Sequence, residues 1–399
     1  MRTFKKLLVL CLIFLVTPTA TAADLPQTFS FKGAGYGHGV GMSQIGAKAK
    51  ALAGEDASTI INYYYKEITI APVVDTQILR VNIGHLLTSA SIKSGSVGST
   101  VNIYQGDIKD SVDALPIASL TSKSGISLTQ FGSQVIPTIV TGKKTQLLPP
   151  GKDWTIRWSG TRYLPGGDST VSVKIAGKSV KYRHGQIQIK SVKAGAAGYK
   201  MEITNSVRLH DEYLFGVSEV PYALYKAGKI KYSCDCDLYG HISDQTFAGF
   251  SKEAEPIYGA LWKAAVAATS QGDQMGLAIT YLDKPISTYF FSSSGGVTET
   301  SLNAWGTAQA YTASVADPSS LDPLINPRYY TWNKTITQEI AAKAFALPDV
   351  ASLVIASRNE TGTVGTITAT SSTGVVASLR GETFRSRTQL PSAWFDFSN

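Results

Sequence analysis

The stretch from Gly33 to Gly46 concentrates residues that could form a recognition loop. It reads GAGYGHGVGMSQIG, with six glycines among fourteen residues. Glycine adopts positive φ and lets a ligand approach the backbone closely, so we expect a shaped loop. The Walker spacing and its lysine are absent, as is the later glycine of a dinucleotide fingerprint, which argues against phosphate binding. From the pattern alone, a glycine-rich turn with a satisfied histidine is favoured; a binding loop would present Tyr36, His38, Met42, Ser43 and Gln44.

A second group of candidate residues could hold a metal ion. Cys234, Cys236 and His241 lie close together in CDCDLYGH, and their side chains are types that bind zinc. The C-x-C pair lacks the usual C-x-x-C spacing, and two exported cysteines could equally form a disulfide. We therefore expect no required cofactor, with a structural zinc ion as the alternative.

Ser292, Ser293 and Ser294 form a second loop of small residues with Gly295 and Gly296. The loop could present hydroxyl and amide groups to a sugar, and a tight turn is an equally good interpretation. The chain contains no GxSxG elbow and no ordered Ser/His/Asp set, which argues against a serine hydrolase.

The elements that must position these loops are mainly strands. Between Gln77 and Thr204, short apolar–polar runs alternate with Gly, Pro, Asp and Ser, which predicts a β-rich region. Trp154 and Trp158 are expected to pack in its core or a groove, although a separate sugar-binding module is an alternative. Helices are predicted over Ala47–Tyr65, interrupted by Gly54, and over Glu253–Thr269. The predicted strands are ILRVNIG, SASIKSG, STVNIYQG, WTIRWSG, STVSVKIAG and GQIQIKSV.

The first 22 residues of the 399 have the pattern of a secretory signal peptide. A basic start is followed by the apolar run LLVLCLIFLV and by Ala20-Thr-Ala22 as a cleavage site. Removing three of the 37 basic residues leaves 34 against 29 acidic ones, a net charge of +5. This modest excess suits an anionic cell wall. The sequence contains no basic run interleaved with aromatic residues, so it does not indicate nucleic-acid binding. We expect a secreted protein without a membrane span in its mature chain.

The glycine-rich stretch carries a specific family signature. GHGVGMSQIGA resembles a motif of the stage II sporulation protein D (SpoIID)/LytB family of bacterial peptidoglycan-cleaving proteins, and IINYYYKEITI resembles its continuation. Further similar motifs follow in order: YLFGVSEVP, TYFFSSSGGVTET, YTASVADP and GETFRSRTQLPSAWF. The resemblance covers essentially the whole mature chain. Many members carry the glycine-rich block at the end of the chain, whereas here it opens the mature protein.

The resemblance implies that the protein is a lytic transglycosylase with Glu219 as its acid/base. Such an enzyme works with one carboxyl group, because the 6-hydroxyl of muramic acid attacks the anomeric carbon and closes a 1,6-anhydro ring. Glu219 would protonate the bridge oxygen and then accept the proton of that hydroxyl. Apolar neighbours such as Val217 and Val220 would raise its pKa for this task. Without the motif, a surface glutamate before a proline turn would be the better interpretation.

The resemblance also implies a fold and a set of contacts. We expect an α+β fold: a signal peptide (1–22), a SpoIID-like catalytic core (23–75 and 201–399) and a β-rich accessory region (76–200). The substrate would be glycan strands stripped of stem peptides, and Glu219 would lie close to the glycine-rich loop. The implied glycan contacts are His38, Gly39, Met42, Ser43, Gln44, Gln245, Ser292, Ser293 and Ser294.

One departure from the family pattern supports a rival function. The long alanine-rich helix that usually follows the glutamate motif is missing, because Glu219-Val-Pro221 runs almost directly into KAGKIKYSCDC. That helix would orient the glutamate, and a displacement of about 1 Å can cost on the order of 100-fold in rate. The rival is a non-catalytic wall-binding protein that modifies or activates an amidase, so other cell-wall hydrolases would be its partners.

Overall fold

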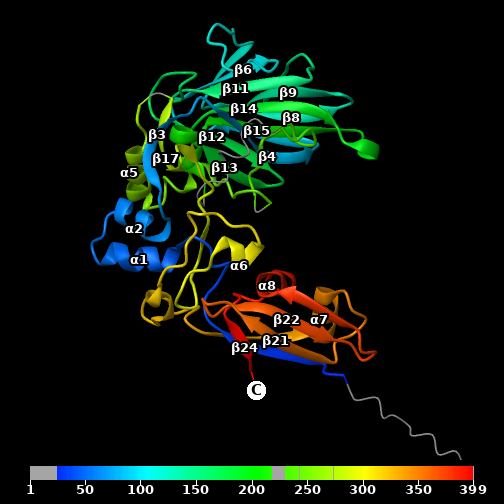
Figure 1. Cartoon of the computed structure of the whole chain (residues 1–399). Helices are drawn as coiled ribbons and strands as arrows, with labels where there is room; N and C mark the ends of the chain where they lie inside the picture. The colour runs from blue at the N-terminus through cyan, green and yellow to red at the C-terminus, as the bar shows by residue number, and fades with distance from the viewer. Residues whose placement is uncertain (1–24, 218–229, 242, 273, 399) are drawn as a thin grey trace, which may run out of the picture. The chain divides into compact units, whose positions relative to one another are not determined.

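The structure is a computed structural model that describes residues 25–217, 230–241, 243–272 and 274–398 (Figure 1). The chain forms two compact units. Unit 1 combines Met1–Lys66 with Tyr289–Asn399, and unit 2 is Glu67–Thr288. Glu219 and the expected signal peptide lie outside the described residues. None of the described helices is long and apolar enough to cross a membrane.

Unit 2 is dominated by two large sheets. Among the described residues, one sheet has the strand order β16-β4-β15-β14-β11-β6-β7 and the other β10-β9-β8-β5-β12-β13. Neighbouring strands are antiparallel except for β16 and β4, which are parallel. The six runs predicted as strands are confirmed as β4, β5, β6, β11, β12 and β14. The bounds are β4 (Ile78–Leu87), β5 (Ser89–Ser94), β6 (Thr100–Gln105), β7 (Ala118–Thr121), β8 (Ser124–Phe131), β9 (Gln134–Thr141), β10 (Lys144–Leu147), β11 (Asp153–Trp158), β12 (Val171–Ile175), β13 (Lys178–Tyr182), β14 (Gln186–Lys193), β15 (Tyr199–Arg208) and β16 (Leu238–Tyr239).

Residues from both large sheets share one hydrophobic core. Trp154 and Trp158 are fully buried in it, together with Ile92, Ile126 and Ile203. The alternation of apolar and polar residues along each strand turns one face of each sheet toward this core. The two tryptophans are therefore core residues, as expected, and do not form a sugar-binding surface.

The rest of unit 2 is a small sheet and short helices. The sheet order is β18-β17-β3, with β3 (Thr69–Val74), β17 (Met275–Tyr281) and β18 (Lys284–Pro285). The helix predicted over Glu253–Thr269 is confirmed in part, because α5 begins only at Gly259 and ends at Thr269. The other short helices are η1 (Gly195–Ala197), the π-helix η2 (Leu209–Tyr213), α3 (Leu214–Gly216) and η3 (Gly249–Ser251).

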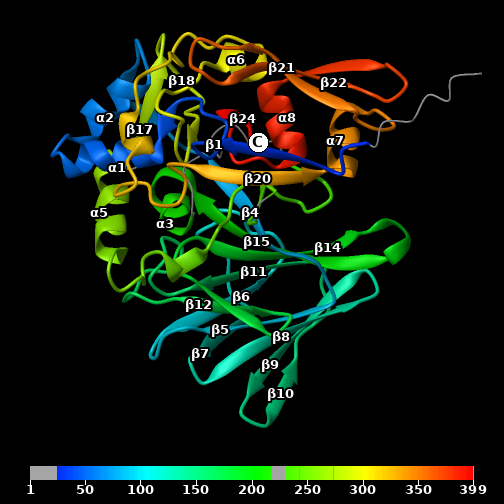
Figure 2. The same ribbon diagram turned by 90° about the horizontal axis from the view of Figure 1, so that it is seen from below.

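Unit 1 joins the two ends of the described chain in one sheet. Strand β1 (Thr28–Gly33) lies between β20 (Trp332–Thr337) and β24 (Phe395–Phe397), antiparallel to both (Figure 2). A second sheet has the order β21-β22-β23, formed by Ser352–Arg358, Val364–Thr370 and Val376–Arg380. A short parallel pair joins β2 (Met42–Ser43) to β19 (Phe290–Phe291).

Short helices complete unit 1. Helices α7 (Gln338–Phe345) and α8 (Gly381–Thr388) pack on the β21-β22-β23 sheet (Figure 1). The helical stretch predicted over Ala47–Tyr65, interrupted by Gly54, is confirmed as two helices, α1 (Gln44–Leu52) and α2 (Ala57–Tyr64), with Gly54 between them. The remaining helices are α6 (Ser301–Trp305) and η4 (Pro318–Leu321).

The expected α+β fold class is wrong, because the structure is mostly β. The part expected to be a catalytic core of mixed composition contains many strands and only short helices. Runs such as SLVIASR and VGTITAT in β21 and β22 are rich in β-branched residues that fit a pleated, half-buried surface. The alanine-rich stretches form only the short helices α1, α5 and α7, which are 9, 11 and 8 residues long, so they cannot supply a helical layer.

Candidate functional site

The glycine-rich loop lies against the serine loop in unit 1. Tyr36 forms a bridge with Ser293, Val40 forms one with Glu299, and β2 pairs with β19. The backbone N–H of Ile45 also donates to the carbonyl oxygen of Ser292 at 3.0 Å. Main-chain hydrogen bonds thus bring together two motifs that lie far apart in the sequence.

Glycine is required in this loop where it approaches a backbone carbonyl. Gly41 has φ of +79°, and a Cβ atom there would lie 2.1 Å from the carbonyl oxygen of Tyr289. The neighbouring Met42 N–H donates to that same oxygen at 3.0 Å. A side chain at position 41 would therefore push the glycine-rich loop away from Tyr289, the residue directly before β19.

The His38 side chain forms a hydrogen bond within the glycine-rich loop. Its Nδ1 accepts a hydrogen bond from the Val40 N–H at 3.0 Å, so the ring carries its proton on Nε2. The ring packs against Trp305 with centroids 5.1 Å apart and against Phe291 at 5.8 Å. Burial, followed by the charge of Arg385, lowers the pKa of His38 to about 4, although a hydrogen bond with the Phe290 backbone opposes the shift. His38 is therefore neutral at physiological pH.

This pKa predicts that unit 1 loses stability in mild acid. Below about pH 6.5 the unfolded chain binds a proton that folded His38 does not bind, so stability falls as the pH falls from 6.5 toward 4. The loss between pH 7 and pH 5 should be about 2 kcal/mol. Urea unfolding at both pH values checks it: His38→Gln should remove most of this loss, and His241→Gln should not. Equal losses in all three proteins would contradict the assignment.

The neighbouring residues Met42, Ser43 and Gln44 differ in their roles. Ser43 is fully buried, and its Oγ accepts from the Gly46 N–H at 3.1 Å, which caps helix α1. Met42 is half-buried in β2, whereas Gln44 is exposed at the start of α1. Ser43 thus supports the loop, and Gln44 is the polar side chain of the three that remains available to a ligand.

The serine loop is held mainly by a buried carboxylate, Asp317. The Ser294 and Ser320 hydroxyls donate to its Oδ2 at 2.7 and 2.6 Å, and the Tyr64 hydroxyl donates to its Oδ1 at 3.2 Å. Burial and the charge of Asp317 raise the pKa of Tyr64, so this hydroxyl keeps its proton. Ser294 is therefore a structural residue. Ser293 is fully buried, and its Oγ has no hydrogen-bond partner among the described residues.

A second buried residue with a carboxylate, Glu299, is hydrogen-bonded to the glycine-rich loop and to neighbouring segments. Its Oε1 accepts from the Thr300 N–H at 2.7 Å and from Asn303 at 2.9 Å, and its Oε2 accepts from Thr361 at 2.5 Å. Its backbone N–H donates to the carbonyl oxygen of Gly39 at 2.7 Å. Glu299 and Asp317 lie within the motifs TYFFSSSGGVTET and YTASVADP, but the sequence pattern did not indicate a role for either of them. The signal available in the sequence was their position, because Glu299 directly follows SSSGGVT and Asp317 lies within ASVADP.

Aromatic rings border the glycine-rich loop. Tyr36, 45% exposed, packs against Tyr329 with ring centroids 4.4 Å apart. Trp305, 37% exposed, contacts both His38 and Tyr289, the latter at 4.7 Å. Exposed aromatic faces beside a rigid loop are suited to stacking on flat, apolar faces of a ligand. The sequence did not reveal this group because its members come from separate segments.

In unit 2, the segment that leads toward Glu219 is firmly packed up to Val217. The ring of Tyr213 stacks on Phe247 with centroids 5.4 Å apart, and Val217 forms a bridge with Phe247. Gln245 is buried and accepts from the Tyr213 hydroxyl at 2.8 Å, so it braces this segment and has little surface to offer a glycan. Glu219 and the missing-helix region after it lie outside the described residues.

The predicted metal ligands have other roles. Cys234 and Cys236 form a disulfide, so they are not the two thiolates that a zinc site needs. His241 is exposed, and its ring lies 5.2 Å from that of Tyr239. Within the part of the chain that the structure describes, no group of three His, Cys, Asp or Glu side chains could hold a metal ion.

Comparisons with known proteins give one partial match. The chain is 31% identical over 129 residues to stage II sporulation protein D of Bacillus amyloliquefaciens. The match covers 31% of this chain and 34% of that protein, so the chain spans about a third of the length of the curated relative. No family model matches the chain, and no solved structure matches it.

Proposed function

We propose that this chain is a secreted, sporulation-related cell-wall protein that cleaves peptidoglycan glycan strands by lytic transglycosylation. The observation that carries the proposal is the pairing of the glycine-rich loop with the serine loop through Tyr36–Ser293 and β2–β19. Both motifs resemble motifs of the SpoIID/LytB family. The partial similarity to stage II sporulation protein D also supports a cell-wall function.

The proposed chemistry needs one carboxyl group. Glu219 donates its proton to the glycosidic oxygen while the bond from that oxygen to the anomeric carbon breaks. The 6-hydroxyl of the same muramic acid then attacks the oxocarbenium-like carbon, and the carboxylate of Glu219 accepts the hydroxyl proton. The products are a 1,6-anhydro-muramic end and a free 4-hydroxyl, and Glu219 returns to its starting state.

Unit 1 contributes a glycan-binding surface in this proposal. Ser43, Ser294 and His38 serve the loop internally, so we assign sugar contact to exposed groups around it. Gln44 supplies a polar side chain, and the aromatic rings of Tyr36 and Trp305 supply faces on which a pyranose ring stacks. Such a surface recognises glycan strands without requiring a charged side chain.

Substitution of these rings tests the proposed surface. We expect Tyr36→Ala and Trp305→Ala each to weaken binding of a chitin oligosaccharide about 10-fold, which corresponds to about 1.4 kcal/mol. Tyr232→Ala is the matched control, because Tyr232 is 94% exposed in unit 2. Calorimetric titration measures all three affinities, and an unchanged affinity in both loop variants would remove the surface from the proposal.

A product assay separates cleavage from the rival function. Purified mature protein is incubated with denuded glycan strands and with intact peptidoglycan, and products are identified by mass spectrometry. Lytic transglycosylation predicts fragments with 1,6-anhydro ends from the denuded strands. Bound but intact strands, or faster release of stem peptides by an added amidase, would instead support the non-catalytic wall-binding protein, which the missing helix after Glu219 favours.

A further inference from the structure

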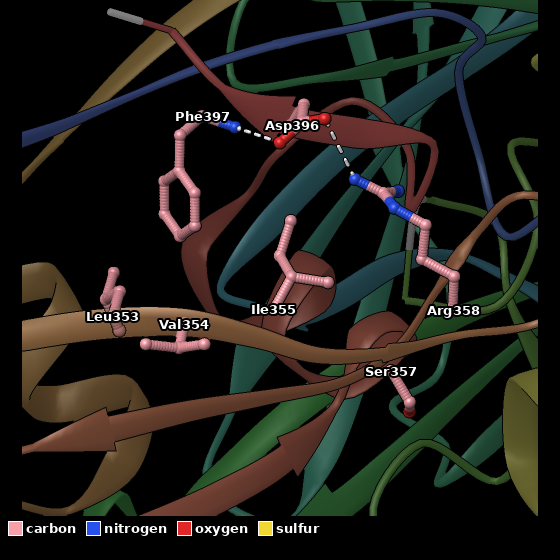
Figure 3. A pocket seen from close by; sticks show the side chains of 7 residues that line it. All are labelled: Leu353, Val354, Ile355, Ser357, Arg358, Asp396 and Phe397. Carbon is pink, nitrogen blue, oxygen red and sulfur yellow. Dashed lines mark hydrogen bonds and ion pairs between the residues drawn. The ribbon is translucent and has the colours of Figure 1, made fainter.

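The described part of unit 1 contains five arginines, and three of them bind other groups of the protein. Arg358 forms an ion pair with Asp396 at 3.1 Å (Figure 3), and Arg385 forms an ion pair with Glu382 at 2.7 Å. Arg387 donates to a main-chain carbonyl oxygen of helix α7 at 2.5 Å. These three side chains therefore serve the fold of the unit.

The other two arginines, Arg328 and Arg380, are exposed. Within the described ranges, neither forms an ion pair or a hydrogen bond with the protein. A guanidinium group in this state keeps its five N–H donors for a ligand, and its planar fork matches a carboxylate. What distinguishes these two arginines is their position beside aromatic rings at the glycine-rich loop.

Arg328 lies beside the ring pair that includes Tyr36. Its guanidinium carbon is 5.2 Å from the ring centroid of Tyr329, which packs against Tyr36 at 4.4 Å. Two hydrogen bonds fix this turn: the Tyr329 carbonyl oxygen accepts from the Gly35 N–H at 2.8 Å, and the Tyr329 N–H donates to buried Asn326 at 3.2 Å. Arg328 is therefore held next to the glycine-rich loop.

Arg380 lies beside the second ring, Trp305. Helix α6, which ends at Trp305, contacts helix α8, which begins directly after Arg380 (Figure 1). Gly306 follows Trp305 with φ of +80°, and a Cβ atom there would lie 2.7 Å from the guanidinium carbon of Arg380. Glycine at this turn thus leaves space for the guanidinium group. Because the Trp305 ring packs against His38 at 5.1 Å, this arginine also lies near the glycine-rich loop.

The two arginines border one short stretch of the glycine-rich loop. Tyr36 and His38 contact the rings beside the arginines, and they are two residues apart, so their Cα atoms lie within about 7 Å of each other. Each position combines an aromatic face for a pyranose with a guanidinium group for an anion. This arrangement suits a ligand with a repeating sugar and a repeating negative charge.

We propose that Arg328 and Arg380 are specificity-determining residues that bind the free lactyl carboxylates of muramic acid. The inference rests on the proposed function and names the groups that select its substrate. Muramic acid is every second sugar of a peptidoglycan strand, and its lactyl group ends in a free carboxylate where no stem peptide is attached. Aromatic faces alone accept any pyranose, whereas an arginine–carboxylate pair distinguishes a strand that carries this acid from an uncharged glycan.

The rings argue against another anion of the cell wall. A polyol phosphate chain has negative charges for the arginines, but it has no pyranose face for Tyr36 or Trp305. Such a chain would use half of each position, whereas a muramic acid residue uses the ring and the arginine together.

Calorimetric titration with matched ligands tests the proposal. The protein is the mature Glu219→Gln variant, in which the ligand should stay intact. The ligands are a denuded peptidoglycan tetrasaccharide, its carboxylate methyl ester and a chitin tetrasaccharide. We expect the ester and the chitin tetrasaccharide to bind about 10-fold more weakly than the free acid, and higher salt to weaken binding of the free acid alone.

Substitutions assign the effect to the two arginines. In the same background, Arg328→Gln and Arg380→Gln should each lower the affinity for the free acid about 5-fold and leave the affinity for the ester unchanged. The unchanged affinity for the ester also shows that each variant is folded. Lys343→Gln is the matched control, because it removes one exposed positive charge from helix α7 of the same unit.

Equal affinities for the acid and the ester overturn the proposal, as does the absence of binding to both. It is also overturned if either arginine variant binds the acid like its parent, if Lys343→Gln loses as much affinity, or if polyglycerol phosphate binds as tightly as the free acid. The product assay on the wild type separates this inference from the proposed function. Anhydro ends together with equal affinities refute the arginine sites alone, whereas carboxylate-dependent binding without anhydro ends refutes the cleavage alone.

Discussion

Gly41→Ala should destabilise unit 1 by on the order of 4 kcal/mol, because two costs add at this position. An alanine with φ of +79° adopts the left-handed region, which costs about 1–2 kcal/mol. Its Cβ atom would also lie 2.1 Å from the Tyr289 carbonyl oxygen, so the loop must move away and lose the hydrogen bond from Met42. Chemical denaturation measured by circular dichroism gives the free energy of unfolding.

Gly54→Ala is the matched control for this effect. Gly54 has a similar φ of +88°, but no atom lies within 4 Å of the Cβ position. We expect it to cost only the backbone strain, about 1–2 kcal/mol. Equal losses of unfolding free energy in Gly41→Ala and Gly54→Ala would contradict the close approach of the glycine-rich loop to Tyr289.

Glu219→Gln should lower the rate of glycan cleavage by about 10²–10⁴-fold, the usual contribution of a general acid/base. The amide has nearly the same size and polarity as the carboxyl group, but it neither donates a proton to the leaving oxygen nor accepts one from the 6-hydroxyl. Glycan binding should be retained, because the proposed sugar contacts lie on unit 1. Initial rates on denuded strands measure the change.

Glu360→Gln controls for the loss of one negative charge. Glu360 is exposed in unit 1, and we assign it no role in binding or catalysis. Its variant should cleave at the wild-type rate. A comparable loss in both variants would point to a general charge effect rather than to acid/base catalysis by Glu219.

The strand pattern was the most predictable part of the fold. The alternation in ILRVNIG or WTIRWSG is a local property, so it located β4 and β11 from the sequence alone. The fold class was not predictable in this way. The sequence marked the break at Gly54, but whether alanine-containing stretches such as Ala47–Tyr65 form long or only short helices depends on packing as well as on local propensity.

The candidate site was predictable in its backbone and much less in its side chains. Glycine spacing indicated a shaped loop around His38, and the structure shows four positive-φ glycines between residues 35 and 41. The sequence could not reveal that His38, Ser43 and Ser294 are satisfied internally, because their partners Val40, Ser320 and Asp317 are fixed by tertiary structure. The expected proximity of Glu219 to the loop stays a prediction.

The most direct test of the central claim is to count 1,6-anhydro ends by mass spectrometry after digestion of denuded glycan strands. We predict that wild type and Glu360→Gln produce these ends while Glu219→Gln, which still binds the strands, produces almost none. Wild-type levels of anhydro ends from Glu219→Gln, or none from the wild type itself, would contradict the account.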